Sequence, residues 1–169
     1  MADASLSLSE KDLDSLMKAY DALGSFPDVS DALKSLKDDS SITACVFSNG
    51  TSSMIQNSLN GSPDLSPHAS VFKHIVVVEE PKKFKPAPEV YYHLAKQVGK
   101  EGKMGEMWLV SGNPFDVVGA RAMGMNAAWV DREGNGWADQ LVQGEKGRPS
   151  VVVKGLGEVV EAVRKFQKK

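Results

Sequence analysis

The sequence is poor in the features that mark several classes of protein. It contains one cysteine, Cys45, so it forms no internal disulfide and no cysteine-rich zinc site. Its formal net charge is only −2, which gives no reason to expect nucleic acid or an anionic membrane as a partner. No apolar run approaches the roughly 18–20 residues of a membrane span. The start, MADASLSLSEKD, has neither the basic n-region nor the apolar h-region of a secretory signal. We therefore expect a cytoplasmic protein.

Two further absences concern cofactors. Neither of the glycine-rich nucleotide patterns, GxxxxGK[ST] and GxGxxG, is present. The three histidines, His68, His74 and His93, are scattered without the spacing of metal ligands. The sequence therefore predicts no cofactor and no metal.

The chain does have the composition of a globular domain, with 41% hydrophobic and 25% charged residues. Short apolar runs alternate with amphipathic helical patterns, which predicts an α/β fold whose parallel sheet is covered on both faces. The expected strands are 42–47, 75–78, 107–110, 127–130 and 151–153. The expected helices are 10–23, 29–36, 52–60, 88–98, 114–123 and 156–166.

Polar residues mark the start of two expected helices. Ser9 followed by Asp12 is a capping-box pattern, in which each side chain bonds to a backbone N–H of the other residue. Asp28 precedes the second helix and is expected to cap it.

Two expected strand ends carry residues suited to binding an anion. Ser48, Asn49 and Gly50 bring a hydroxyl, an amide and an unhindered backbone to a helix amino terminus, where oxyanions bind. The same three residues also make an ordinary turn. Lys85 precedes Pro86, which disfavours the helical conformation at the lysine. Lys85 therefore lies just before a helix, where it either points into a crevice or remains a solvated charge.

A third polar strand end covers residues 111–116. Ser111, Asn113 and Asp116 fall at the end of a strand and in the first turn of the next helix. The charge of Asp116 would also favour that helix start without any other role. Ligands of open parallel sheets bind outside the carboxyl ends of the strands, so we expect the three strand ends to face one site.

In this order, the segments resemble a known superfamily. FSNG, KFKPAPEVY and WLVSGNPFDVVGARAMGMNAAWVDR are similar to motifs two, three and four of the haloacid dehalogenase superfamily, most of all its 2-haloacid dehalogenase branch. The resemblance runs from about Leu13 to about Phe166. It implies a Rossmann-like, three-layer α/β/α fold with a mostly parallel sheet. It also implies a hydrolase that removes halide from a small 2-haloacid through an aspartyl-ester intermediate.

The resemblance implies roles for particular residues as well. Lys85 would balance charge beside the nucleophilic aspartate, while Ser48 and Asn49 would hold the substrate carboxylate, with Tyr91 near the pocket. The nucleophile, the water and the lysine would be positioned by Ser111, Asn113 and Asp116.

One of these positions separates two branches of the family. Phosphatase members have a Gly-Asp pair where this chain has Gly112-Asn113, and their aspartate helps to bind magnesium. Asn113 therefore favours the metal-independent dehalogenases.

The chain departs from the family at one point. Family members begin with a central strand ending in Asp-x-x-Gly-Thr, whose aspartate attacks the substrate, and then insert a helical cap. No such motif occurs in this sequence. We therefore expect a truncated form, with residues 1–24 as a remnant of the cap and 25–169 as the core. The gap left by that strand could close if strands 42–47 and 107–110 pair directly, or if another chain donates a strand. Alternatively, the chain could be a fragment of a longer protein. Residues 4–8 could also fill the gap weakly.

Three functions remain open at this stage. A dehalogenase-like hydrolase without its attacking carboxylate is expected to be inactive, because covalent catalysis needs that group. A non-catalytic module that binds a small anion or dimerises is one alternative, and non-hydrolytic use of the same pocket is another. The expected partner is a small molecule with a carboxylate, and the resemblance leaves a homodimer open.

Overall fold

The fold is that of a computed structural model, which describes residues 8–21, 23–140 and 142–168. The expected filler strand thus falls almost wholly outside the described residues. Each expected helix and strand is present, with ends shifted by a few residues. The helices are α1 (Glu10–Asp21), α2 (Val29–Lys37), α3 (Ser52–Gly61), α4 (Pro88–Gln97), α5 (Pro114–Ala122) and α6 (Val159–Gln167). The strands are β1 (Ala44–Ser48), β2 (Phe72–Val77), β3 (Trp108–Ser111), β4 (Asn126–Val130) and β5 (Val151–Val153).

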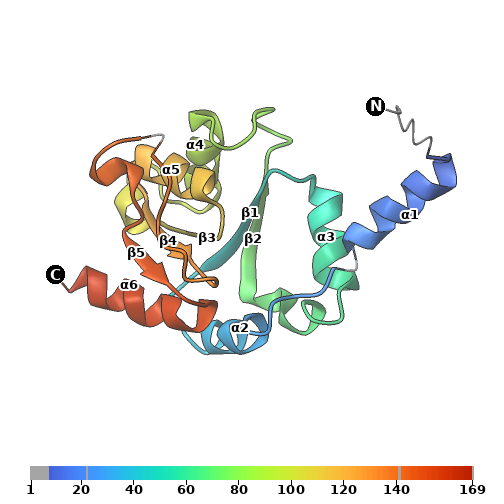
Figure 1. The fold of residues 1–169 in the computed structure, drawn as a ribbon, viewed down its shortest axis with the longest axis horizontal. Helices are drawn as coiled ribbons and strands as arrows, with labels where there is room; N and C mark the ends of the chain where they lie inside the picture. The colour runs from blue at the N-terminus through green and yellow to red at the C-terminus, as the bar shows by residue number, and fades with distance from the viewer. Residues whose placement is uncertain (1–7, 22, 141, 169) are drawn as a thin grey trace, which may run out of the picture.

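The strands form two parallel sheets covered by helices (Figure 1). β1 pairs with β2 in one sheet, and β3, β4 and β5 form the other in that order. Helix α5 contacts β3 and β4, while α6 contacts β5 from the other side in Figure 1. None of the described helices is long and apolar enough to cross a membrane.

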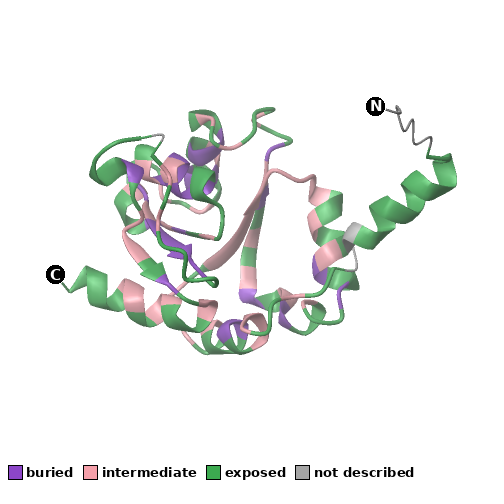
Figure 2. Ribbon diagram, viewed as in Figure 1, coloured by how far each residue is buried: buried purple, intermediate pink, exposed green. Residues whose placement is uncertain are grey.

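A break separates the two sheets between β1 and β3. Within the described residues, β1 pairs only with β2 and β3 only with β4, so the direct pairing that we considered is wrong there. Every residue of β1 is half-buried, whereas most of β4 is fully buried (Figure 2). Val110 in β3 is 40% exposed. Strands of a helix-covered parallel sheet are normally buried on both faces, so the strands beside the break are incompletely covered.

Side-chain packing nevertheless connects the two sheets. The core cluster includes Val76 from β2, Leu109 from β3 and the fully buried Tyr91 from α4. Phe47 of β1 packs against this cluster and meets Tyr91 edge to face, with ring centroids 5.4 Å apart. Aromatic pairs of this geometry add to the stabilisation from burial alone. The core therefore extends across the break and brings the ends of β1 and β3 to the same region.

The capping box predicted at α1 is confirmed. The Asp12 carboxylate accepts a bond of 3.0 Å from the Ser9 N–H, and the Ser9 hydroxyl accepts one of 3.2 Å from the Asp12 N–H. The bonds from Ser9 lower the pKa of Asp12, because they favour the charged carboxylate.

The cap predicted for α2 is wrong. Asp28 stands at the N-cap position, but its side chain makes no capping bond. Its carboxylate instead accepts the Leu156 N–H at 2.8 Å and pairs with the Arg132 guanidinium at 3.1 Å. Burial of Asp28 opposes its charge, but these two partners outweigh that effect and lower its pKa. The long-range partners tie the start of α2 to the carboxyl-terminal part of the fold.

The Asp28→Asn variant tests this tie. We expect it to lower the free energy of unfolding by about 1–3 kcal/mol at neutral pH, because the Arg132 pair and the bond to Leu156 weaken. Since the folded pKa is lowered, the stabilisation is present above the unfolded pKa of about 3.9 and is lost as the pH falls through the folded value. Urea unfolding at pH 7 and pH 3 measures this, with exposed Asp38→Asn as the control. A loss of the same size at both pH values would contradict the assignment.

Candidate active site

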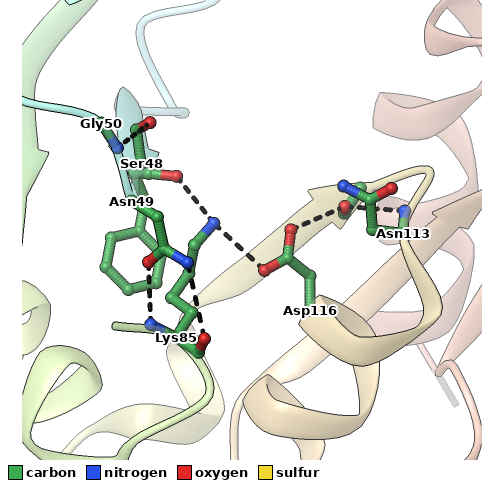
Figure 3. A network of polar contacts seen from close by, with 8 residues as sticks. Ser48, Asn49, Gly50, Lys85, Asn113 and Asp116 are labelled. Atoms are coloured by element: carbon green, nitrogen blue, oxygen red, sulfur yellow. Dashed lines mark hydrogen bonds and ion pairs between the residues drawn. The ribbon is translucent and has the colours of Figure 1, made fainter. Parts of the chain in front are cut away.

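A buried ammonium group lies where β1, the loop before α4 and the start of α5 meet (Figure 3). The Lys85 and Asp116 side chains are each only 8% exposed, and Lys85 Nζ lies 3.1 Å from Asp116 Oδ1. Lys85 Nζ also donates to the Phe47 carbonyl at 3.1 Å and lies 4.9 Å from the centroid of the Phe47 ring. The predicted lysine is therefore no solvated charge. It bridges the end of β1 and the helix that follows β3.

The other oxygen of Asp116 connects this pair to the end of β3. Asp116 Oδ2 accepts the Ser111 hydroxyl proton at 3.0 Å, and the Ser111 oxygen accepts the Asn113 N–H at 3.0 Å. Asn113 enters this network through its backbone, and the residue itself is exposed. Asp116 Oδ1 makes no aligned hydrogen bond, although the ammonium is 3.1 Å away. Its accepting capacity on that side is therefore not fully used.

Ser48 and Asn49 lie at the end of β1, beside the loop that carries Lys85 (Figure 3). The Ser48 hydroxyl oxygen accepts the Gly50 N–H at 3.0 Å and so fixes the turn. The Asn49 amide bonds to the backbone of Lys85: Oδ1 accepts its N–H at 2.8 Å, and Nδ2 donates to its carbonyl at 3.4 Å. The two residues thus shape the loop that presents the lysine.

The start of α3 already binds a carboxylate of the chain itself. The Thr51 side chain caps the helix by accepting the Met54 N–H at 3.3 Å. The next amide, the N–H of Ser52, donates to the carboxylate of the exposed Glu79 at 2.7 Å. A helix amino terminus favours negative charge because its N–H groups lack partners within the helix. Glu79 of the chain itself uses this N–H, so binding of a substrate anion at the turn after β1 stays a prediction.

Tyr91 lies beneath this network rather than on its surface. It is completely buried, and its hydroxyl has no hydrogen-bond partner in the described structure. Burial raises the pKa of Tyr91, and the negative charge of nearby Asp116 raises it further. The hydroxyl therefore stays protonated, with a proton that it can donate.

Sequence reasoning missed Gly119, which makes this packing possible. A Cβ added there would overlap the Tyr91 hydroxyl and would lie 2.8 Å from Cβ of Pro86. The available signal was a glycine inside the helical pattern 114–123, because such a residue often has a packing reason. The contribution of Phe47 was missed as well, because it comes from a main-chain oxygen.

The described residues contain no group of three or more His, Cys, Asp or Glu side chains placed to hold a metal ion. That the protein functions without a metal ion stays a prediction.

Comparison with known proteins identifies the family. The family model for haloacid dehalogenase-like hydrolases matches residues 2–124 of the 169. The chain belongs to this family. Its similarity to known (S)-2-haloacid dehalogenases places it in the 2-haloacid dehalogenase branch.

Two bacterial relatives and one solved structure illustrate the similarity of this dehalogenase-like chain. It is 32% identical over 122 residues to (S)-2-haloacid dehalogenase 4A of Burkholderia cepacia, covering 72% of this chain and 50% of the relative. It is 34% identical over 155 residues to (S)-2-haloacid dehalogenase H-109 of Pseudomonas putida, covering 91% of this chain and 63% of the relative. The structure of L-2-haloacid dehalogenase from Xanthobacter autotrophicus with chloropropionic acid covalently bound has the same fold, with a TM-score of 0.77 at 24% identity, covering 94% of this chain and 69% of that one.

The chain thus spans between half and under two thirds of the length of these curated relatives. The fold expected from the resemblance is confirmed as an α/β fold with parallel sheets that matches known dehalogenases.

The Lys85→Met variant tests the buried ion pair. We expect it to lower the free energy of unfolding by about 3–5 kcal/mol, because it leaves the Asp116 carboxylate buried without its counter-charge. A second change, Asp116→Asn, is expected to restore part of that loss, which a double-mutant cycle measures by urea unfolding. The matched control is Lys165→Met, which breaks an exposed pair with Glu161 and is expected to have no measurable effect. An equal, small effect of both lysine changes would contradict a buried pair.

The Gly119→Ala variant tests the packing around Tyr91. We expect a loss of about 1–3 kcal/mol, because the new methyl group collides with the Tyr91 hydroxyl and Pro86. Adding Tyr91→Phe should recover part of this loss, because it removes the colliding oxygen. Gly157→Ala serves as the control, since a Cβ there meets nothing within 4 Å. If the second change brings no recovery, Tyr91 is not the group that restricts residue 119.

Proposed function

We propose that this chain carries the carboxylate-binding and lysine-presenting part of a 2-haloacid dehalogenase. Its ligand is then a small acid such as a 2-haloacid, bound where the ends of β1 and β3 meet. In this proposal Ser48 and Asn49 hold the substrate carboxylate and Tyr91 lies beneath it. Lys85, Ser111, Asn113 and Asp116 form the catalytic group around the reacting carbon.

The observation that carries this proposal is the burial of Lys85 in a paired state. An ammonium group has three hydrogens to donate, and the contacts to Phe47 and Asp116 use two directions. In this proposal the third points to the substrate carboxylate. Asp116 already offsets the lysine charge, so the additional attraction for an anion comes partly from the amino terminus of α5, in whose first turn Asp116 lies. Such a site suits a singly charged carboxylate.

The reaction of the family explains what this site does in a complete enzyme. An aspartate oxygen displaces the halide from the substrate carbon, which forms an ester and releases the halide ion. Water then cleaves the ester to give a 2-hydroxy acid and restores the carboxylate. Asp116 is badly placed for the first step, because one of its oxygens faces the ammonium and the other accepts from Ser111. We therefore propose that the chain alone binds the acid without turning it over.

A second candidate is a non-catalytic module that binds an anion or dimerises. Helix α1 favours it, because Leu13, Leu16 and Met17 are all exposed on a helix that extends away from the body in Figure 1. Apolar side chains grouped on one exposed helix commonly mark a protein contact. Both candidates use the same anion site. They differ in whether that site belongs to a dehalogenase or to a module without catalytic activity.

The experiment is a paired measurement on the purified chain. Binding of L-2-chloropropionate is followed by NMR, and halide release is followed in the same sample. We expect binding without halide release, and about a tenfold or greater loss of affinity in Lys85→Ala, because a charge-assisted contact disappears. Halide release that is lost in Lys85→Ala would show that another group acts as the nucleophile. Equal binding by wild type and variant would place the ligand elsewhere and overturn the proposed site.

A further inference from the structure

The side chain of Asn49 bonds to both main-chain groups of Lys85 (Figure 3). Its Oδ1 accepts the Lys85 N–H at 2.8 Å and its Nδ2 donates to the Lys85 carbonyl at 3.4 Å. We propose that Asn49 acts as a positioning residue, which holds the backbone of Lys85 so that its ammonium reaches Phe47 and Asp116. This inference rests on the proposed function only in that Lys85 is taken to bind the substrate.

The main chain of Lys85 depends on this amide. Lys85 belongs to no helix or strand, and the backbone bonds of the described loops and turns include neither its N–H nor its carbonyl. The following residue, Pro86, has no N–H to donate. The nearest backbone bonds of the loop join Lys82 to Val78 and Ala87 to Phe84, each at 2.9 Å. Neither one fixes the peptide groups of Lys85 itself.

Packing of neighbouring side chains does not replace the amide either. Phe84, directly before the lysine, is 67% exposed, and Lys83 is exposed as well. A lysine side chain loses rotamer entropy when it is held in one position. When the backbone of Lys85 is already fixed, fewer side-chain conformations compete with the one that places the ammonium at Phe47 and Asp116. The amide of Asn49 supplies that constraint.

These two bonds, called the clamp below, also set the distance between the Lys85 backbone and the group that its ammonium contacts. Asn49 lies two residues after Phe47 along the same chain segment, and Phe47 provides the carbonyl that accepts from Nζ. One segment therefore holds the lysine at both its main chain and its ammonium. The Ser48 hydroxyl, between the two contacts, fixes the turn by accepting the Gly50 N–H. The other contact of the Lys85 ammonium is its ion pair with Asp116.

This assignment changes which groups at the end of β1 are left for a ligand. The Asn49 amide is already engaged through its oxygen and one of its two N–H groups, while the Ser48 hydroxyl accepts a bond but keeps its proton to donate. For the carboxylate, this turn therefore offers the Ser48 hydroxyl and the second N–H of Asn49. A substitution at Asn49 acts on the ligand both directly and through Lys85.

The test compares Asn49→Leu, which loses both bonds, with Asn49→Asp, which keeps an acceptor for the Lys85 N–H. Asn60→Leu, on the exposed end of α3, is the control. Amide hydrogen exchange is measured at Lys85 and Ala87, together with the ¹⁵N signal of the Lys85 ammonium. We expect exchange at Lys85 to accelerate at least about tenfold in Asn49→Leu and much less in Asn49→Asp. The ammonium signal should broaden or shift in the same order, while Ala87 and the control stay as in wild type.

Three results would overturn the proposal. The first is unchanged exchange at Lys85 in Asn49→Leu, since the bond would then protect nothing. The second is faster exchange at Lys85 with an unchanged ammonium signal, because the backbone clamp would not position the side chain. The third is equal acceleration at Lys85 and Ala87, which would indicate general loosening of the loop. No readout requires a ligand, so failure of L-2-chloropropionate to bind would contradict the proposed function and leave the clamp intact.

Discussion

The contact between Lys85 and Asp116 is the one on which the site depends, because it joins two sheets that share no backbone pairing in the described chain. A buried pair of charges costs desolvation energy, and mutual attraction offsets that cost only when the remaining donors and acceptors are also satisfied. Here Phe47 accepts from the ammonium, Ser111 donates to the carboxylate, and Asn49 holds the lysine backbone. These partners come from β1, from the end of β3 and from the turn between β1 and α3. The pair is stable only as part of this assembly.

The break between β1 and β3 gives the fold its unusual character. The edge of a strand presents unpaired N–H and carbonyl groups, which readily pair with another strand. The half-burial of β1 and the exposure of Val110 agree with an open position at that place. By the resemblance stated above, the first strand of the family lies between these two strands. The relatives are also longer than this chain, which covers half to under two thirds of their length.

Local patterns predicted much of this structure, and long-range contacts account for what they missed. Alternating strands and helices place polar residues at strand ends, so Ser48, Lys85 and Asp116 could be assigned to one region from the sequence. The capping box at Ser9 was equally local, since its two members are three residues apart. The partner of Asn49 lies 36 residues away, and the partners of Asp28 lie 104 and 128 residues away. Which group reaches a side chain over such separations depends on the packed fold, which no short pattern contains.

The central claim is that one buried ion pair couples the two sheets, and native-state hydrogen exchange tests it most directly. Amide exchange is followed in β1, β2, β3 and β4 at increasing sub-denaturing urea, for wild type and for Lys85→Met. The account predicts that in wild type both sheets open with one common free energy, as a single cooperative unit. In Lys85→Met, β1 and β2 should open at a clearly lower free energy than β3 and β4. Separate opening of the two sheets in wild type, or a common opening in the variant, would contradict the claim.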